Sequence, residues 1–187
     1  MAETMANGSV RSEKSKVIHT ELGAFADAIN SAHAGILSRV IEARDWNIHR
    51  DVDGFSALRA WLMERFDFHV RTAADIAAIA RLSKKFRALA SAACAGEARI
   101  DPVAFAVRQL DKTPAMRVYA RTPYAEPVPS PWNASVACPT PEHLIAQYCA
   151  HATFDQLATH LAELAASLAE SAELFDGLSQ QSLQRLE

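Results

Sequence analysis

Apolar residues recur along most of this chain at intervals of three and four, which is the period of an amphipathic helix. In the first third they form the series Ile18, Leu22, Phe25, Ile29, Ala32, Ile36, Leu37 and Val40. The series predicts one long helix from Val17 to about Arg44, and its spacing is close to a heptad repeat. We expect this stripe to pack on the rest of the same domain, on a second copy of the chain, or on both.

The middle of the chain predicts a helix, a tight turn and a second helix. A polar loop ends at Gly54, and Ser56 stands where a helix N-cap is expected. The first helix then continues to Phe66, and the turn is expected at Asp67–His69. A short helix, a tight turn and a second helix form a shape that many proteins use to contact DNA.

The second helix of this pair is predicted to start at Thr72 and to run to Gly96. A glycine just after the last apolar position is a common helix stop. Beyond it, Asp101 is expected to cap a further helix that has Pro102 at its first position and continues to Leu110. The pattern gives almost no indication of strands.

Seven of the eight prolines lie between Pro114 and Pro141, in a stretch without apolar periodicity. This composition predicts a linker or an extended strap on the surface of the domain. Helical periodicity returns from Pro141 to about Leu174, and Thr153 is expected to break this block and to cap its second part.

Together these patterns predict an all-α fold, an irregular multi-helix domain with a Pro-rich strap and a C-terminal helical segment that packs back on it. The expected organisation is a disordered N-terminus at residues 1–15, a helical domain at 16–112, the strap at 113–141, the C-terminal helical segment at 142–178 and a tail at 179–187.

Charge is distributed unevenly along the chain. Lysines and arginines number six, twelve and one in residues 1–50, 51–122 and 123–187, against six, eight and eight acidic residues, so the three segments carry net charges of 0, +4 and −7. A basic middle beside an acidic C-terminal part has two interpretations. The acidic part lies against the middle, or the middle binds a polyanion and the acidic part points elsewhere.

The candidates for DNA contact lie on the predicted second helix and just before it. They are five basic residues and one threonine: Arg71, Thr72, Arg81, Lys84, Lys85 and Arg87. Arginine and lysine side chains on one helix face would neutralise phosphates, which gives affinity without sequence specificity. The alternative is an ordinary solvated face, because Arg81, Lys84 and Lys85 would be exposed together in either case.

The same stretch of chain carries a resemblance to a known family. The matching residues are Gly54-Phe55-Ser56, Ala60-Trp61-Leu62, Phe66-Asp67-Phe68, Ala73, Ala80-Arg81-Leu82, Ala93, Gly96, Ile100 and Ala104. In this order and spacing they resemble the actinobacterial 13E12 repeat family, also known as domain-of-unknown-function family 222. The resemblance covers about Val17 to Leu110. Family members usually have a leucine-proline pair after the arginine-rich helix; Lys85-Phe86-Arg87 stands there instead, which predicts an unbroken helix.

The resemblance implies association with DNA, because many members carry an HNH nuclease domain at the C-terminal end. The motif of that domain is missing here, since the block after Phe154 is predicted as helix and has only His160 as a histidine. The chain is therefore expected to be either the N-terminal part of a longer protein or a short member of the family.

Other chemistry has little support in the sequence. Cys138, His143, Cys149 and His151 are zinc-capable residue types, but their spacing fits no common zinc module, so we expect no metal, and no cofactor motif is present. Asp51 and Asp53 lie near His49, yet a polar loop explains them, and no catalytic residue is assigned.

The chain is expected to be cytoplasmic. Its N-terminus is polar, it has no run of the roughly 18 apolar residues that a membrane helix needs, and its three cysteines are expected to be free thiols. We therefore expect a non-catalytic, DNA-associated accessory domain. The alternative is a helical protein interaction or dimerisation module that uses the long N-terminal or C-terminal helix and binds no nucleic acid.

Overall fold

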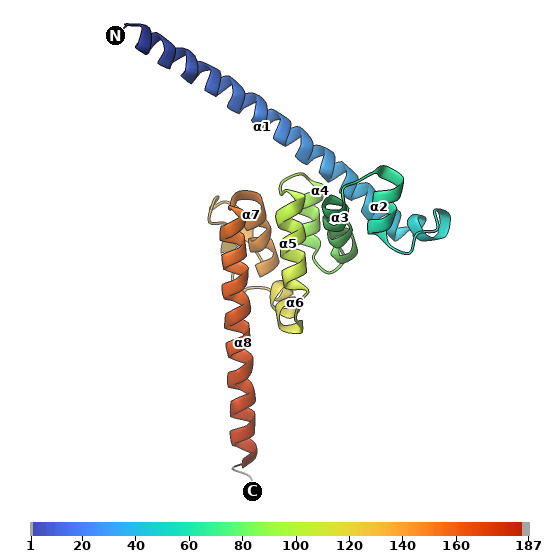
Figure 1. The fold of residues 1–187 in the computed structure, drawn as a ribbon. Coiled ribbons are helices and arrows are strands. Elements are labelled where there is room, and N and C mark those ends of the chain that lie inside the picture. The colour runs from blue at the N-terminus through green and yellow to red at the C-terminus, as the bar shows by residue number, and fades with distance from the viewer. Residues whose placement is uncertain (1, 185–187) are drawn as a thin grey trace.

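The computed structural model describes the backbone of residues 2–184 and the side chains of residues 10–171. The fold is all-α (Figure 1). Its elements are α1 (Ala2–Asp45), the π-helix η1 (Ile48–Val52), α2 (Leu58–Phe66), α3 (Val70–Leu82), α4 (Arg87–Cys94), α5 (Ile100–Leu110), α6 (Pro114–Arg121), β1 (Val128–Pro129), β2 (Ala137–Cys138), α7 (Pro141–His151) and α8 (Phe154–Gln184). The two short strands pair antiparallel, with Val128 opposite Cys138.

The centre of the body is the pair of helices α3 and α5, which pack on each other more extensively than any other two described elements. Helices α1 and α2 pack on α3, and α4, α7 and α8 cover the other side of α5. The core between them holds fully buried Ile76, Ile79, Leu89, Val103 and Leu110. Helices α1 and α8 extend from this body in different directions (Figure 1).

Helix α1 divides into two parts with different surroundings. Its C-terminal part packs on the body, where Leu37 and Val40 are buried. The Asn30 side-chain amide donates to the carbonyl of Gly96 at 2.7 Å, which marks the place where α1 meets the loop after α4. The N-terminal part makes no such contact within residues 10–29, all of which are exposed. The helix also begins at Ala2, so it includes most of the segment 1–15 for which disorder is predicted.

The helix, turn and helix in the middle of the chain are present, with shifted caps. The turn lies at Asp67–His69 as predicted, and Asp67 adopts a left-handed backbone with φ of 54°. The predicted cap Ser56 and the predicted helix start at Thr72 are wrong. Ala57 is the N-cap of α2, and His69 caps α3 because its ring nitrogen accepts from the backbone N–H of Arg71.

The expected unbroken helix to Gly96 is wrong. Helix α3 ends at Leu82, and a turn separates it from α4. In this turn the backbone N–H groups of Lys85 and Phe86 both donate to the carbonyl of Leu82 at 2.9 Å. The turn brings Phe86 into the core, where it is fully buried. Burial of this large side chain favours the break, because it offsets the intrahelical hydrogen bonds that the turn loses.

Two further boundaries differ from expectation. Arg99 is the N-cap of α5, so Asp101 lies in the first turn and is not the cap. The first part of the predicted strap is a helix, α6, in which Pro114 occupies the first turn and the Thr113 hydroxyl accepts from the N–H of Met116 at 3.2 Å. Threonine followed by proline is itself a helix start signal, and the high proline content of the region obscured it.

The C-terminal block follows the prediction at its internal break. The Thr153 hydroxyl accepts from the N–H of Gln156, and the Gln156 side chain accepts from the N–H of Thr153, which is a capping box. Gly96 likewise ends α4 with a left-handed φ of 74°. Helix α8 continues to Gln184, into the predicted tail at 179–187, and residues 185–187 lie outside the described part of the chain.

Candidate anion-binding pocket

A cavity of about 570 Å³ opens between the C-terminal end of α1, η1, the start of α2 and one face of α3. Its wall on the α3 side consists of the small residues Ala74, Ala77 and Ala78. Five arginines line it: Arg44, Arg50, Arg59, Arg81 and Arg108. No aspartate or glutamate of the described part of the chain lines it. We call this cavity the arginine pocket.

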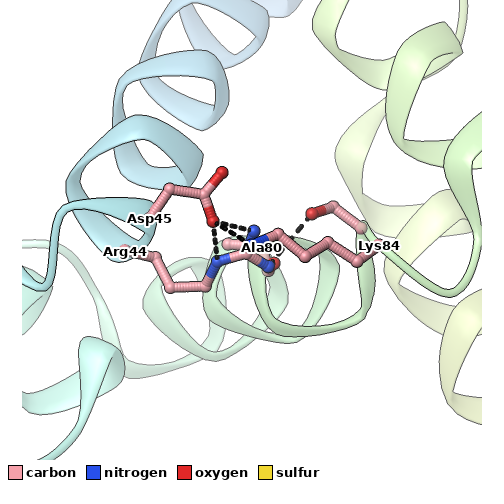
Figure 2. Close-up of polar contacts among 5 residues, drawn as sticks. Arg44, Asp45, Ala80 and Lys84 are labelled. Atoms are coloured by element: carbon pink, nitrogen blue, oxygen red, sulfur yellow. Dashed lines mark hydrogen bonds and ion pairs between the residues drawn. The ribbon is translucent and has the colours of Figure 1, made fainter.

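Two of these arginines are held in place by the fold. Figure 2 shows that Arg44, near the end of α1, reaches the carbonyl of Ala80 and pairs with Asp45, which also meets Lys84 at 2.9 Å. The hydrogen bonds from Lys84 and Arg44 lower the pKa of the Asp45 carboxyl. Since Ala80 lies in the last turn of α3, the Arg44 guanidinium also stabilises the C-terminal end of that helix.

Arg108 is positioned by a second carboxylate. Its Nη1 lies 2.6 Å from Oδ1 of the buried Asp75, and its Nη2 donates to the carbonyl of Ala74 at 2.9 Å. Both partners belong to α3, so this contact joins α5 to α3 beside the pocket. Arg44 and Arg108 are therefore held in position, and the carboxylates of Asp45 and Asp75 partly balance their charges.

The other three arginines have no carboxylate partner in the described part of the chain. Arg50, Arg59 and Arg81 are exposed, and none of them makes a side-chain hydrogen bond or ion pair with another residue of the described chain. Each guanidinium presents five N–H donors in a planar fork that suits carboxylate and phosphate oxygens. These three side chains supply the free positive charge of the pocket.

The N-terminus of α2 faces the same space. Ser56, Ala57 and Leu58 line the cavity, the N-cap makes no side-chain hydrogen bond, and the first turn has no acidic residue. The first N–H groups of a helix lack intrahelical partners and carry the positive end of its dipole. Arg59 adds a positive charge there, which is unfavourable without an anion, so this end of α2 is suited to bind one.

His49 lines the pocket and has one buried ring nitrogen without a partner in the described chain. Its side chain is 5% exposed, and its Nδ1 is the one buried side-chain nitrogen or oxygen without a hydrogen-bond partner within residues 10–171. It belongs to η1, and π-helical turns occur frequently at functional sites. A buried polar atom without a partner costs stability, and Nδ1 is closed off from the open cavity, so His49 contributes shape to the lining.

The structure does not bring the six predicted DNA-contact residues together. Arg81 alone lines the arginine pocket, and Arg71 and Thr72 line none of the described cavities. Lys84, Lys85 and Arg87 line a second cavity of about 680 Å³ on the other side of the turn. The expected common face of Arg81, Lys84 and Lys85 is wrong, because α3 ends before the two lysines.

The second cavity is less suited to an anion. Lys84 and Lys85 lie 2.9 and 3.0 Å from Asp45 and Asp111, so both are already paired. Glu97 and the buried Glu142 also line it. One residue of the acidic C-terminal part therefore does lie against the basic middle of the chain, within this cavity.

The sequence pattern did not indicate four of the five pocket arginines or the place of His49 in the lining. They come from separate elements between α1 and α5, and His49 and Arg50 resemble a solvated loop in the sequence. The signal that could have found the site is local: an arginine in the first turn of a helix that has no side-chain cap is unfavourable for the helix dipole.

The zinc-capable residue types do not gather in one place. His143 lies 2.8 Å from the Thr140 hydroxyl, and His151 packs near Trp132. Cys138 and Cys149 are buried free thiols, and burial raises the pKa of Cys149 to about 12. Within the described residues, no group of three or more histidine, cysteine or acidic side chains is arranged to hold a metal ion.

Among the described residues, no helix combines the length and the apolar character needed to cross a bilayer. Comparison with known protein families, with curated proteins and with solved structures gives no match.

Proposed function

We propose that this chain is a non-catalytic, DNA-associated domain that binds backbone phosphates at the arginine pocket. The observation that carries the proposal is the convergence of Arg50, Arg59 and Arg81, none of them paired, on the uncapped N-terminus of α2. Phosphate oxygens accept hydrogen bonds from guanidinium groups and from helix N-terminal N–H groups alike.

The chemistry of the lining supports binding of phosphates and gives little basis for reading bases. The wall of alanines and the arginine side chains offer positive charge and shape, and the only ring in the lining is that of His49. Phosphate contacts fix a protein on DNA without carrying sequence information. We therefore expect affinity that varies little with sequence and falls steeply with salt.

One structural feature and one sequence feature favour DNA over other polyanions. The pocket is formed in part by α2 and α3, the helix, turn and helix of the chain, in which α2 packs on α3. The same stretch resembles the 13E12 repeat family, whose association with HNH nucleases implies DNA. On this proposal the domain positions DNA for chemistry that another part of the protein or a partner performs.

The test is a fluorescence anisotropy titration of labelled duplex DNA with the chain, repeated over a series of salt concentrations. A triple variant, Arg50→Gln, Arg59→Gln and Arg81→Gln, should weaken binding by about tenfold or more and lower the salt slope by about 3. These side chains are exposed and make no described internal contact, so the variant should keep the stability of the parent chain.

The matched control removes three exposed charges elsewhere, with Lys14→Gln, Arg99→Gln and Lys112→Gln. We expect it to change the affinity by less than about threefold, because distant charges are screened. An equal loss in both variants would show that total charge, and not the pocket, governs binding. Absence of DNA binding by the parent chain at low salt would refute the proposal itself.

A further inference from the structure

The exposed part of α1 carries an apolar stripe without a partner in the chain. Ile18, Leu22, Phe25 and Ile29 are between 51% and 64% exposed, although all four are large apolar residues. Isolated helices of this kind are marginal in water, and Gly23 lowers helix propensity in the middle of the stripe. The part of α1 that leaves the body therefore needs a surface to pack on.

The spacing of the stripe is that of a coiled coil. The intervals from Ile18 through Ile29 are four, three and four residues, and two further steps lead to Ala32 and Ile36. These are the a and d positions of a heptad repeat. The flanking positions include the small residues Ala26, Ala28 and Gly35, so a second helix can approach closely.

The stripe ends in an apolar groove on the body. A cavity of about 440 Å³ between α1 and α2 is lined by Ile36, Trp61, Phe66 and Phe68, among others, and Arg39 is the only charged residue that lines it within the described chain. Phe66 is 54% exposed beside it. Stripe and groove form one continuous apolar surface, because Ile36 belongs to both.

A second copy of α1 fits this surface in one orientation. If the helices run antiparallel about a twofold axis between Leu22 and Phe25, Leu22 of each copy faces Phe25 of the other, and Ile18 faces Ile29. In this register the groove around Ile36 of one copy lies opposite Arg11 of the other, so the four apolar positions of the stripe carry the contact. The stripe is self-complementary about its own centre, as a twofold symmetric interface requires.

The parallel orientation is disfavoured by two features. It would bring the two bodies together at the Ile36 end, where α1 already packs on α3 and α4. It would also align the basic segment of Arg11, Lys14 and Lys16 with its own copy. In the antiparallel orientation the two bodies lie at opposite ends of the paired helices, and the two basic segments are likewise apart.

The stripe gives a small dimer interface. Each large side chain of the stripe has about 60–120 Å² of apolar surface to bury, on the usual relation between area and transfer free energy. The eight such side chains of the two copies bury roughly 480–960 Å² together, and the flanking alanines extend this toward the lower end of the roughly 1,200–2,000 Å² buried by stable interfaces. We infer that the chain forms an antiparallel homodimer through the α1 stripe, Ile18, Leu22, Phe25 and Ile29.

Analytical ultracentrifugation of the full chain over a wide concentration range tests the assembly. The parent chain should sediment as a dimer, and Phe25→Glu should raise the dimer dissociation constant by about a hundredfold or more. The control is Ala24→Glu, which adds the same charge next to it on the solvent side of the heptad and should leave the dimer intact. A monomeric parent chain, or a dimer that survives Phe25→Glu, would overturn the inference.

Distance measurement between spin labels tests the orientation. With Val10→Cys labelled in a Cys94→Ser background, the antiparallel arrangement separates the two labels by about 40 Å, from 27 residues at the helical rise of about 1.5 Å. A parallel pair would hold them within roughly 20 Å, because packed helix axes lie about 8–10 Å apart. The short distance would overturn the antiparallel arrangement. Neither experiment involves DNA, so their outcomes are independent of the proposed function.

Discussion

The carboxylate of Glu142 in α7 accepts a hydrogen bond from the backbone N–H of Leu89 in α4 at 3.1 Å. Helix α4 has Phe86 as its N-cap, which makes no side-chain cap hydrogen bond. A residue 53 positions later in the chain thus supplies the acceptor that the start of α4 lacks, and its negative charge faces the positive end of the helix dipole. The contact joins the C-terminal segment to the centre of the fold.

This contact predicts how stability depends on pH. Burial raises the pKa of Glu142 above its ordinary value of 4.5, against the effect of the backbone N–H groups of Leu89 and Ala88. Between pH 4.5 and the folded pKa, Glu142 is protonated in the folded state and ionised in the unfolded state. The free energy of unfolding should therefore fall as pH rises from 4.5 through the folded pKa. Glu142→Gln keeps the acceptor oxygen and has no charge, so its urea denaturation midpoint should not fall over this range.

Glu142→Ala separates the contribution of the charge from that of the hydrogen bond. It removes both the charge and the acceptor, and it leaves the N–H of Leu89 buried without a partner. Relative to Glu142→Gln, we expect a loss of about 1–3 kcal/mol in the free energy of unfolding at every pH measured. Equal stability of the Ala and Gln variants would show that the hydrogen bond contributes nothing.

A second pH effect is expected at His160. Its ring stacks on Tyr148 with centroids 4.3 Å apart, and burial lowers the pKa of His160 against the opposing charge of Glu163. The unfolded state therefore binds the proton more readily, and stability should rise with pH from the folded pKa up to about 6.5. His160→Phe should lose this rise in urea denaturation between pH 5 and 8; an unchanged slope would assign the effect to other groups.

Gly96 should tolerate no side chain without cost. Its φ of 74° lies in the left-handed region, and its carbonyl accepts from Asn30 at 2.7 Å. Gly96→Ala should lower the free energy of unfolding by about 1 kcal/mol, because a Cβ strains this backbone conformation. Chemical denaturation at neutral pH measures the change.

Gly23 provides the matched comparison. It lies within α1, and a Cβ added there meets nothing within 4 Å. Gly23→Ala should raise helix content by circular dichroism and stabilise α1 by about 0.5–1 kcal/mol. If both alanine variants were destabilised alike, the backbone conformation of Gly96 would not be the cause.

Local sequence signals located much of the helical framework. Thr153 and Gln156 form a capping box, and Gly96 ends α4; both signals depend on residues a few positions away. The turn at Asp67–His69 also followed from nearby residues. These features were predictable because their hydrogen bonds and backbone preferences are satisfied within one turn of chain. The helical period identified the α1 stripe for the same reason.

The sequence by itself therefore determined the all-α class and several helix ends, because these depend on neighbours along the chain. Only the tertiary structure decided the break before Phe86, which depends on burial in the core and on Glu142 from α7. It also decided the arginine pocket, since Arg50, Arg59 and Arg81 meet only when α2 and α3 pack beside η1. Contacts between distant residues follow from how the helices pack on one another, and no short-range pattern encodes that packing.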